Sequence, residues 1–119
     1  MERIRRIFYK EKSIFYFDYR GLEDDGAFLK VFRDSSDLVV KENTPSLHIA
    51  NITGVFITPG LIQPILAEIE RFKPYVLRSA IVGVVGAKRV LFQAYLGIFG
   101  ERTKAFEEET DALKWLVSE

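Results

Sequence analysis

Few residues in this sequence have the types and spacing that catalysis or metal binding requires. The 119 residues include one histidine, His48, and no cysteine. A serine–histidine–aspartate triad would have to use His48, which lies between Leu47 and Ile49 and alternates with neither a carboxylate nor a nucleophile. A metal site would rest on carboxylates almost alone. We therefore predict no catalytic residue, no metal site and no cofactor, and we interpret His48 as a structural residue.

Two acidic clusters, at 24–25 and 107–109, are the remaining candidates for acid–base or metal chemistry. Each lies where a helix is expected to begin, and negative charge is favourable at a helix N-terminus. We interpret both clusters as helix starts.

The segment 83–88, Gly-Val-Val-Gly-Ala-Lys, follows an expected strand and precedes an expected helix, as a phosphate-binding loop does. It lacks the Walker spacing, a Ser or Thr after the lysine, and the dinucleotide fingerprint, so nucleotide hydrolysis is not predicted. Lys88 and Arg89 nevertheless fall in the first helical turn, where the helix dipole disfavours cations. Together with free backbone N–H groups they could bind an anion; the alternative is a solvated basic pair.

Composition limits the class of protein. Lys and Arg number 17, Asp and Glu also number 17, and the formal net charge is zero, which argues against a nucleic-acid-binding module. Hydrophobic residues make up 48%, enough to exclude disorder. The longest apolar run, 80–87, is far shorter than the roughly 18 residues of a membrane span. We expect one cytoplasmic domain over 1–119, with no transmembrane segment.

The order of apolar runs, polar turns and helix-start signals predicts a β-β-α-β-α-β-α-β-α chain. The expected strands are 4–9, 14–19, 47–51, 80–85 and 103–106, and the expected helices are 24–40, 64–72, 87–99 and 108–117. Thr58, as N-cap, and Pro59 open the second helix; Pro64 is expected to separate its first turn from the regular part. This alternation predicts an α/β fold, a mostly parallel sheet of about five strands with an N-terminal antiparallel hairpin and about four covering helices.

The third helix, 87–99, has an unusually wide apolar surface. Its sheet-facing arc is expected to comprise Val90, Leu91, Ala94, Tyr95 and Ile98. Phe92, Leu96 and Phe99 extend the apolar surface onto the flank. A helix that is apolar on most sides is normally covered. The cover could be the last helix with Trp115, a second subunit or an apolar ligand.

The segment 47–61, Leu-His-Ile-Ala-Asn-Ile-Thr-Gly-Val-Phe-Ile-Thr-Pro-Gly-Leu, resembles STAS domains, the anti-sigma-factor antagonist fold, where a strand leads through a similar loop into a helix. Segments 15–22, 74–76, 79–83 and 112–116, with Phe106, look like the SpoIIAA-like branch of that fold.

In the antagonist family the strand normally ends in Asp, and a serine at the start of the helix accepts a phosphate. Here Ala50 and Asn51 stand at the strand end, and Pro59 falls near the position of the serine. Thr58 is the nearby hydroxyl. The resemblance implies a contact or switch loop at Asn51, Thr53 and Thr58. Phosphate on Thr58 would be favourable at a helix N-terminus; the alternative is that Thr58 only caps the helix.

Two functions follow from these observations. The first is a non-catalytic regulatory or protein-interaction domain that binds an unknown protein partner and forms a homodimer through the surface near the third helix. The second is a small carrier or sensor of an apolar or amphipathic acidic ligand, in analogy to Sec14-type lipid-binding domains. In the carrier, Phe92, Leu96 and Phe99 would bind the tail, and Lys88 and Arg89 the acidic head.

Overall fold

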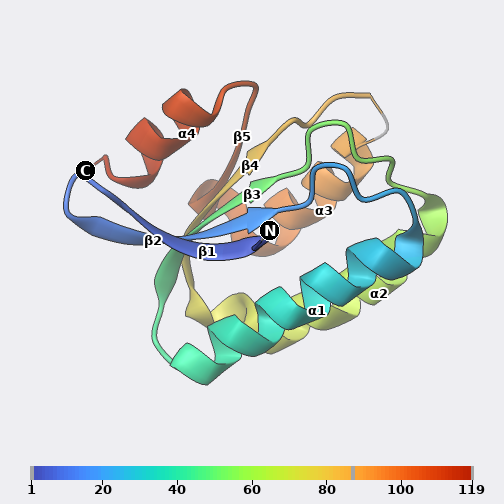
Figure 1. Ribbon diagram of the computed structural model, residues 1–119, viewed down its shortest axis with the longest axis horizontal. Helices are drawn as coiled ribbons and strands as arrows, with labels where there is room; N and C mark the ends of the chain where they lie inside the picture. The colour runs from blue at the N-terminus through green and yellow to red at the C-terminus, as the bar shows by residue number, and fades with distance from the viewer. Residues whose placement is uncertain (1, 87, 119) are drawn as a thin grey trace.

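The computed structural model describes residues 2–86 and 88–118, together with every side chain in them except that of Leu91. These residues form one five-stranded sheet and four α-helices (Figure 1). The predicted α/β class, the hairpin and the number of elements are confirmed. Ala87, where the third helix was expected to begin, lies outside the described residues.

The sheet has its strands in chain order. They are β1 (Ile4–Tyr9), β2 (Lys12–Asp18), β3 (Ser46–Asn51), β4 (Val76–Val82) and β5 (Thr103–Phe106). β1 and β2 are antiparallel and joined by a tight turn at Lys10 and Glu11, both with positive φ, which matches the twist of a two-residue hairpin. The other neighbours are parallel.

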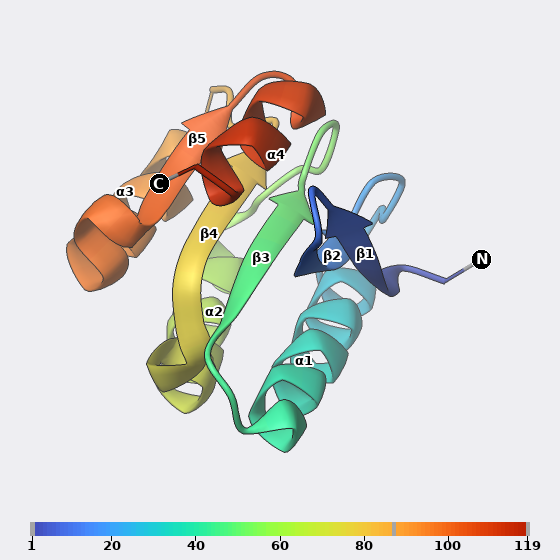
Figure 2. The same ribbon diagram turned by 90° about the vertical axis from the view of Figure 1, so that its left-hand side faces the viewer.

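The helices cover both faces of the sheet. They are α1 (Asp25–Glu42), α2 (Pro59–Phe72), α3 (Lys88–Phe99) and α4 (Glu109–Leu116). Side chains from α1, α2 and α3 share one core with alternate residues of the strands, such as Phe15, Phe17 and Ile81. The short α4 covers the opposite face, mainly over β3, β4 and β5 (Figure 2). Its Ala112 and Leu116 share a second core with Ile14 and Tyr16 of β2.

Two expected boundaries were wrong. α2 runs without interruption from Pro59 to Phe72, with Pro64 inside it. Proline removes one hydrogen bond, to the carbonyl of Gly60 four residues earlier; because Gly60 is exposed, water can bond to that carbonyl instead. The fourth strand occupies Val76–Val82 rather than 80–85. It ends at Gly83, whose φ of +93° takes the chain out of the extended conformation.

Within the described residues, no helix combines the length and apolar character needed to cross a membrane.

Candidate functional site: the loops at the carboxyl ends of the strands

Every parallel strand ends at the same side of the sheet, and each following helix begins there (Figure 1). We call this side the loop edge and define it as residues 2–3, 18–25, 51–58, 82–86, 88–90 and 106–111. Loops held by a rigid scaffold of strands and helices often carry the binding residues of a protein. The loop edge contains all the predicted contact-loop and anion-binding residues.

Asn51, predicted as a contact residue, is buried where β3 ends. Its amide donates a hydrogen bond of 3.2 Å to the Tyr16 hydroxyl, and its carbonyl oxygen accepts one of 3.1 Å from the backbone N–H of Thr53. Asn51 therefore holds the start of the β3–α2 loop against the sheet. The Thr53 side chain is exposed and remains available for contact.

Tyr16 connects this loop to α4. Its buried hydroxyl donates a hydrogen bond to a carboxylate oxygen of Glu109 in the first turn of α4. Burial raises the pKa of Tyr16, and the hydrogen bond to Glu109 raises it further. The tyrosine stays protonated at neutral pH and acts as a donor to α4.

The β3–α2 and β4–α3 loops touch at Gly83. A Cβ on Gly83 would lie 2.7 Å from both the Cα and the backbone nitrogen of Thr53 and 2.6 Å from its hydroxyl. Only glycine permits this approach, which together with the bond from Ile52 N–H to the Val82 carbonyl at 2.9 Å keeps the two loops side by side.

Lys88 and Arg89 differ in their surroundings. The Lys88 side chain is only 8% exposed, and its ammonium donates a hydrogen bond of 3.0 Å to the Ile52 carbonyl. Desolvation lowers its pKa. The Lys88 side chain therefore links the two loops. The alternative of a solvated basic pair was wrong for Lys88. Arg89 is exposed. The anion site stays a prediction, with Arg89 as its accessible cation.

Thr58 occupies the N-cap position of α2, as predicted, but its side chain makes no capping hydrogen bond within the described chain. Its hydroxyl donates instead, at 2.7 Å, to a carboxylate oxygen of Asp25 in the first turn of α1. The neighbouring Asp24 caps α1 by accepting from the Ala27 N–H at 2.7 Å. The interpretation of 24–25 as a helix start is confirmed.

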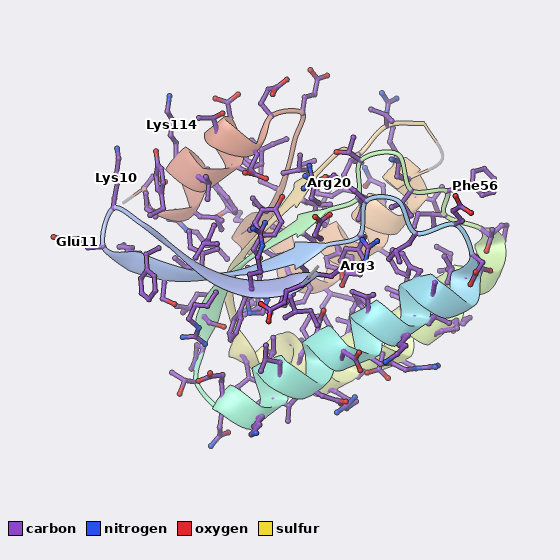
Figure 3. The ribbon with its side chains drawn as sticks, viewed as in Figure 1. Arg3, Lys10, Glu11, Arg20, Phe56 and Lys114 are labelled. Atoms are coloured by element: carbon purple, nitrogen blue, oxygen red, sulfur yellow. The ribbon has the colours of Figure 1, made fainter. Side chains whose placement is uncertain are left out.

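A salt bridge fixes the β2–α1 loop. Arg20 contacts both carboxylate oxygens of Asp18, at 3.0 and 2.9 Å, and this hydrogen bonding holds the pKa of Asp18 below its ordinary value. Arg3 donates to the carbonyls of Asp18 and Arg20 at 3.1 and 2.6 Å. Figure 3 shows both arginines beside this loop.

Phe56, which the sequence reasoning did not single out, is the most exposed large apolar side chain of the loop edge, at 78%. Its neighbours Val55 and Ile57 are buried, so the loop is anchored on both sides while the ring points outward (Figure 3). Val85 and Val90 on the adjacent loop and helix are also more than half exposed. Three consecutive apolar residues in a loop, 55–57, are the signal in the sequence that could have drawn attention to it, but they do not show which side chain faces outward.

The predicted apolar surface of α3 required correction. Phe99 is buried in the core, Phe92 is half-buried against it, and Leu96 is half-buried. Val90, expected to face the sheet, is 64% exposed. α4 and Trp115 do not cover α3, because α4 packs on the opposite face of the sheet. The Leu91 side chain lies outside the described set.

His48 lies inside the sheet–helix core, as a structural residue should. Its Nε2 is 2.8 Å from the Ser46 hydroxyl, and the rings of Phe15 and Phe17 lie 5.8 and 5.6 Å away. Burial lowers its pKa to about 3. The ring therefore stays neutral at physiological pH, and it lines a cavity of about 30 Å³ together with Ser79 and Tyr95.

Comparison of the chain with protein-family models, curated proteins and solved structures found no significant match.

Proposed function

We propose that this chain is a regulatory protein-interaction domain of STAS-like type, which binds a partner through the loop edge and also associates with itself. The observation that carries the proposal is the outward Phe56 ring, presented between two buried anchors. Aromatic residues, phenylalanine included, are enriched in the cores of protein interfaces, where a few residues carry most of the binding energy.

Thr58 is the proposed switch of this surface, two residues after Phe56. A partner kinase would transfer the terminal phosphoryl group of a nucleoside triphosphate to the Thr58 oxygen. The nucleoside diphosphate would be released, and the hydroxyl proton would leave to solvent. The modified side chain could no longer donate to Asp25, and its negative charge would repel the carboxylate 2.7 Å away. The first turns of α1 and α2 would separate, which alters the loop that carries Phe56.

The test compares two variants that lose an equally exposed aromatic ring. Phe56→Asp removes the ring at the loop edge. The matched control is Phe8→Asp, because Phe8 lies on β1 and is 74% exposed. Proteins captured by the wild type are purified, and their binding to each variant is measured by calorimetry. We expect Phe56→Asp to weaken binding about thirtyfold or more and Phe8→Asp to leave it unchanged. Equal effects would overturn the proposed surface.

The carrier is the second candidate, and the cavity beside His48 favours it because Ser79 and Tyr95 supply polar groups inside an aromatic wall. Its volume of about 30 Å³ is room for roughly two water molecules, so an apolar tail would require α1 or α2 to move. Native mass spectrometry separates the candidates. A multiple of the chain mass with nothing added supports the interaction domain, and extra mass lost on denaturation supports the carrier.

A further inference from the structure

We infer that the loop edge of one molecule binds a groove at the opposite side of a second copy, in a head-to-tail arrangement. The inference rests on one part of the proposed function, namely that the loop edge is an interaction surface. It goes further by naming the surface that the loop edge binds when the chain associates with itself. The observations that carry it are the charge distribution, the groove and the position of Phe56.

The side of the sheet opposite the loop edge carries the hairpin turn and the C-terminal ends of the helices. We call it the turn edge and define it as residues 9–13, 39–47, 69–78, 100–103 and 113–118. These segments contain eight Lys and Arg against four Asp and Glu, whereas the loop edge contains nine Asp and Glu against four Lys and Arg. A chain with no net charge thus has one acidic and one basic side.

Helix dipoles do not cancel this asymmetry. All four helices begin at the loop edge, and each N-terminus carries about half a positive charge, about two in total. The excess of five acidic side chains at the loop edge is larger. At the turn edge, the four helix C-termini carry about two negative charges in total, and the excess of four basic side chains is again larger. Two copies placed head to tail therefore attract each other, while identical edges repel.

A groove of about 490 Å³ opens at the turn edge between the hairpin and the starts of β3 and β4. Leu47 and Leu77 supply apolar walls, with the buried Phe15 ring beneath the Arg6 guanidinium. Lys12 supplies positive charge, whereas Arg6 is paired at 2.9 Å with Glu42, which also lines the groove. Leu77 is 52% exposed there. The groove thus offers an apolar surface that the Phe56 ring can contact and positive charge that attracts the acidic residues of the loop edge.

Phe56 and the groove lie at opposite ends of the molecule. Figure 3 shows Phe56 at one end and Lys10, Glu11 and Lys114 at the other. The chain measures 37 × 32 × 29 Å, so an end face of 32 × 29 Å is large enough for the roughly 800 Å² per partner of a standard interface. Surfaces on opposite ends cannot close a two-fold dimer. Their contact is heterologous and produces a growing chain of molecules unless the rotation between neighbours closes it into a ring.

The test uses one variant for each side of the contact. Phe56→Asp removes the ring, and Leu77→Glu places an acid in the groove. The mean mass of each protein is measured by sedimentation at increasing concentration. In about 0.1 M salt we expect the wild type to exceed twice the chain mass of 13.7 kDa. In about 1 M salt, where the screening length falls to about 3 Å, it should return toward the monomer.

A mixture of the two variants tests whether the contact between copies is head to tail. Each alone should associate about thirtyfold more weakly than the wild type and stay near 13.7 kDa. An equimolar mixture retains one intact contact, Phe56 of the Leu77→Glu chain against Leu77 of the Phe56→Asp chain. It should stop at twice the chain mass. Lys30→Glu, on the exposed side of α1 and paired with Asp34, is the charge control and should associate like the wild type.

The remaining outcomes overturn the inference. A mixture that stays monomeric while the wild type forms a dimer of fixed size would indicate a two-fold contact, for which the α3 surface around Phe92 and Leu96 is the candidate. A wild type that is monomeric at every concentration excludes self-association through these edges. In either case, loss of a partner protein specifically in Phe56→Asp would still support the part of the proposed function that concerns binding of a partner through the loop edge.

Discussion

Thr58 and Asp25 are joined by a hydrogen bond of 2.7 Å between the threonine hydroxyl and the aspartate carboxylate. They are 33 residues apart in sequence and belong to the start of α2 and the first turn of α1. The bond connects the two helices at the end where the loop edge lies. The Thr58 hydroxyl thus donates to a carboxylate, which a fully ionised phosphate or a carboxylate at the same position could not do.

A carboxylate at position 58 should destabilise the protein. Thr58→Glu loses a hydrogen bond to a charged group and adds repulsion with Asp25. The new negative charge is favourable at the α2 N-terminus and offsets a part of this loss of stability. We expect a net loss of about 1–2 kcal/mol in the free energy of unfolding, measured in urea. Thr58→Ser, which keeps the donor, should change it by less than about 0.5 kcal/mol.

Asp25→Asn supplies the control for this mechanism. The asparagine amide can donate to the carboxylate introduced by Thr58→Glu, so that substitution should cost at least about 0.5 kcal/mol less in the Asp25→Asn background than in the wild type. Equal costs in both backgrounds would show that the Thr58 and Asp25 side chains do not interact.

Gly83 should be far less tolerant of alanine than Gly54. Both have positive φ, +93° and +76°, which disfavours any side chain by about 1–2 kcal/mol. A Cβ on Gly83 would also meet the backbone of Thr53 at 2.7 Å, whereas on Gly54 it meets no described atom within 4 Å. We expect Gly83→Ala to lower the free energy of unfolding by about 3 kcal/mol or more. A loss no larger than that of Gly54→Ala would contradict the close approach of the two loops.

Much of the fold could be predicted because periodicity and helix-start signals are local. The hairpin, the first helix at Asp24 and the order of elements follow from alternation, capping residues and glycines. The continuous α2 could not be predicted in the same way. Proline lowers helix propensity at any interior position, and only the structure shows that the carbonyl it leaves without a partner lies at an exposed turn.

The candidate site was less predictable than the fold, since it depends on contacts between distant segments. The sequence places Thr58 at a helix start, but its hydrogen bond to Asp25 requires α1 and α2 to pack side by side. The sequence does not show whether Lys88 is solvated, because its hydrogen bond of 3.0 Å is to the carbonyl of Ile52, 36 residues earlier. Phe56 could not be separated from Val55 and Ile57 without knowing which side chains the core accepts.

His48 should make the protein less stable in mild acid. Its pKa is about 3 in the folded state and about 6.5 when the chain is unfolded, so the unfolded state binds the extra proton first. The stabilisation is fully present above about pH 7 and is lost as the pH falls toward 3. Between pH 7 and pH 4.5 we expect a loss on the order of 2 kcal/mol.

His48→Phe isolates this contribution, because phenylalanine fits among Phe15, Phe17 and Phe72 and does not titrate. Urea unfolding of both proteins at several pH values between about 4.5 and 7.5 gives the comparison. The pH dependence should be flatter in the variant by about the same 2 kcal/mol. Parallel curves for the two proteins would mean that His48 is protonated in the folded state as readily as in the unfolded chain.

Tyr16 should determine how firmly α4 is attached. The helix is only eight residues long, and it depends on buried Ala112 and Leu116 together with the hydrogen bond between Tyr16 and Glu109. Tyr16→Phe removes that bond and leaves the buried amide of Asn51 without its acceptor. An unpaired buried polar group costs about 1–3 kcal/mol, so we expect a loss of about 2 kcal/mol in the free energy of unfolding.

Glu109→Ala provides the matched test, since it removes the acceptor but leaves Asn51 bonded to the Tyr16 hydroxyl. Its cost should be smaller, about 1 kcal/mol. Amide hydrogen exchange locates the effect. Both variants should speed exchange in α4, while only Tyr16→Phe should also speed it at Thr53, because the Thr53 N–H is bonded to the Asn51 side chain. Faster exchange at Thr53 in Glu109→Ala as well would show that α4, rather than Tyr16 and Asn51, holds the β3–α2 loop in place.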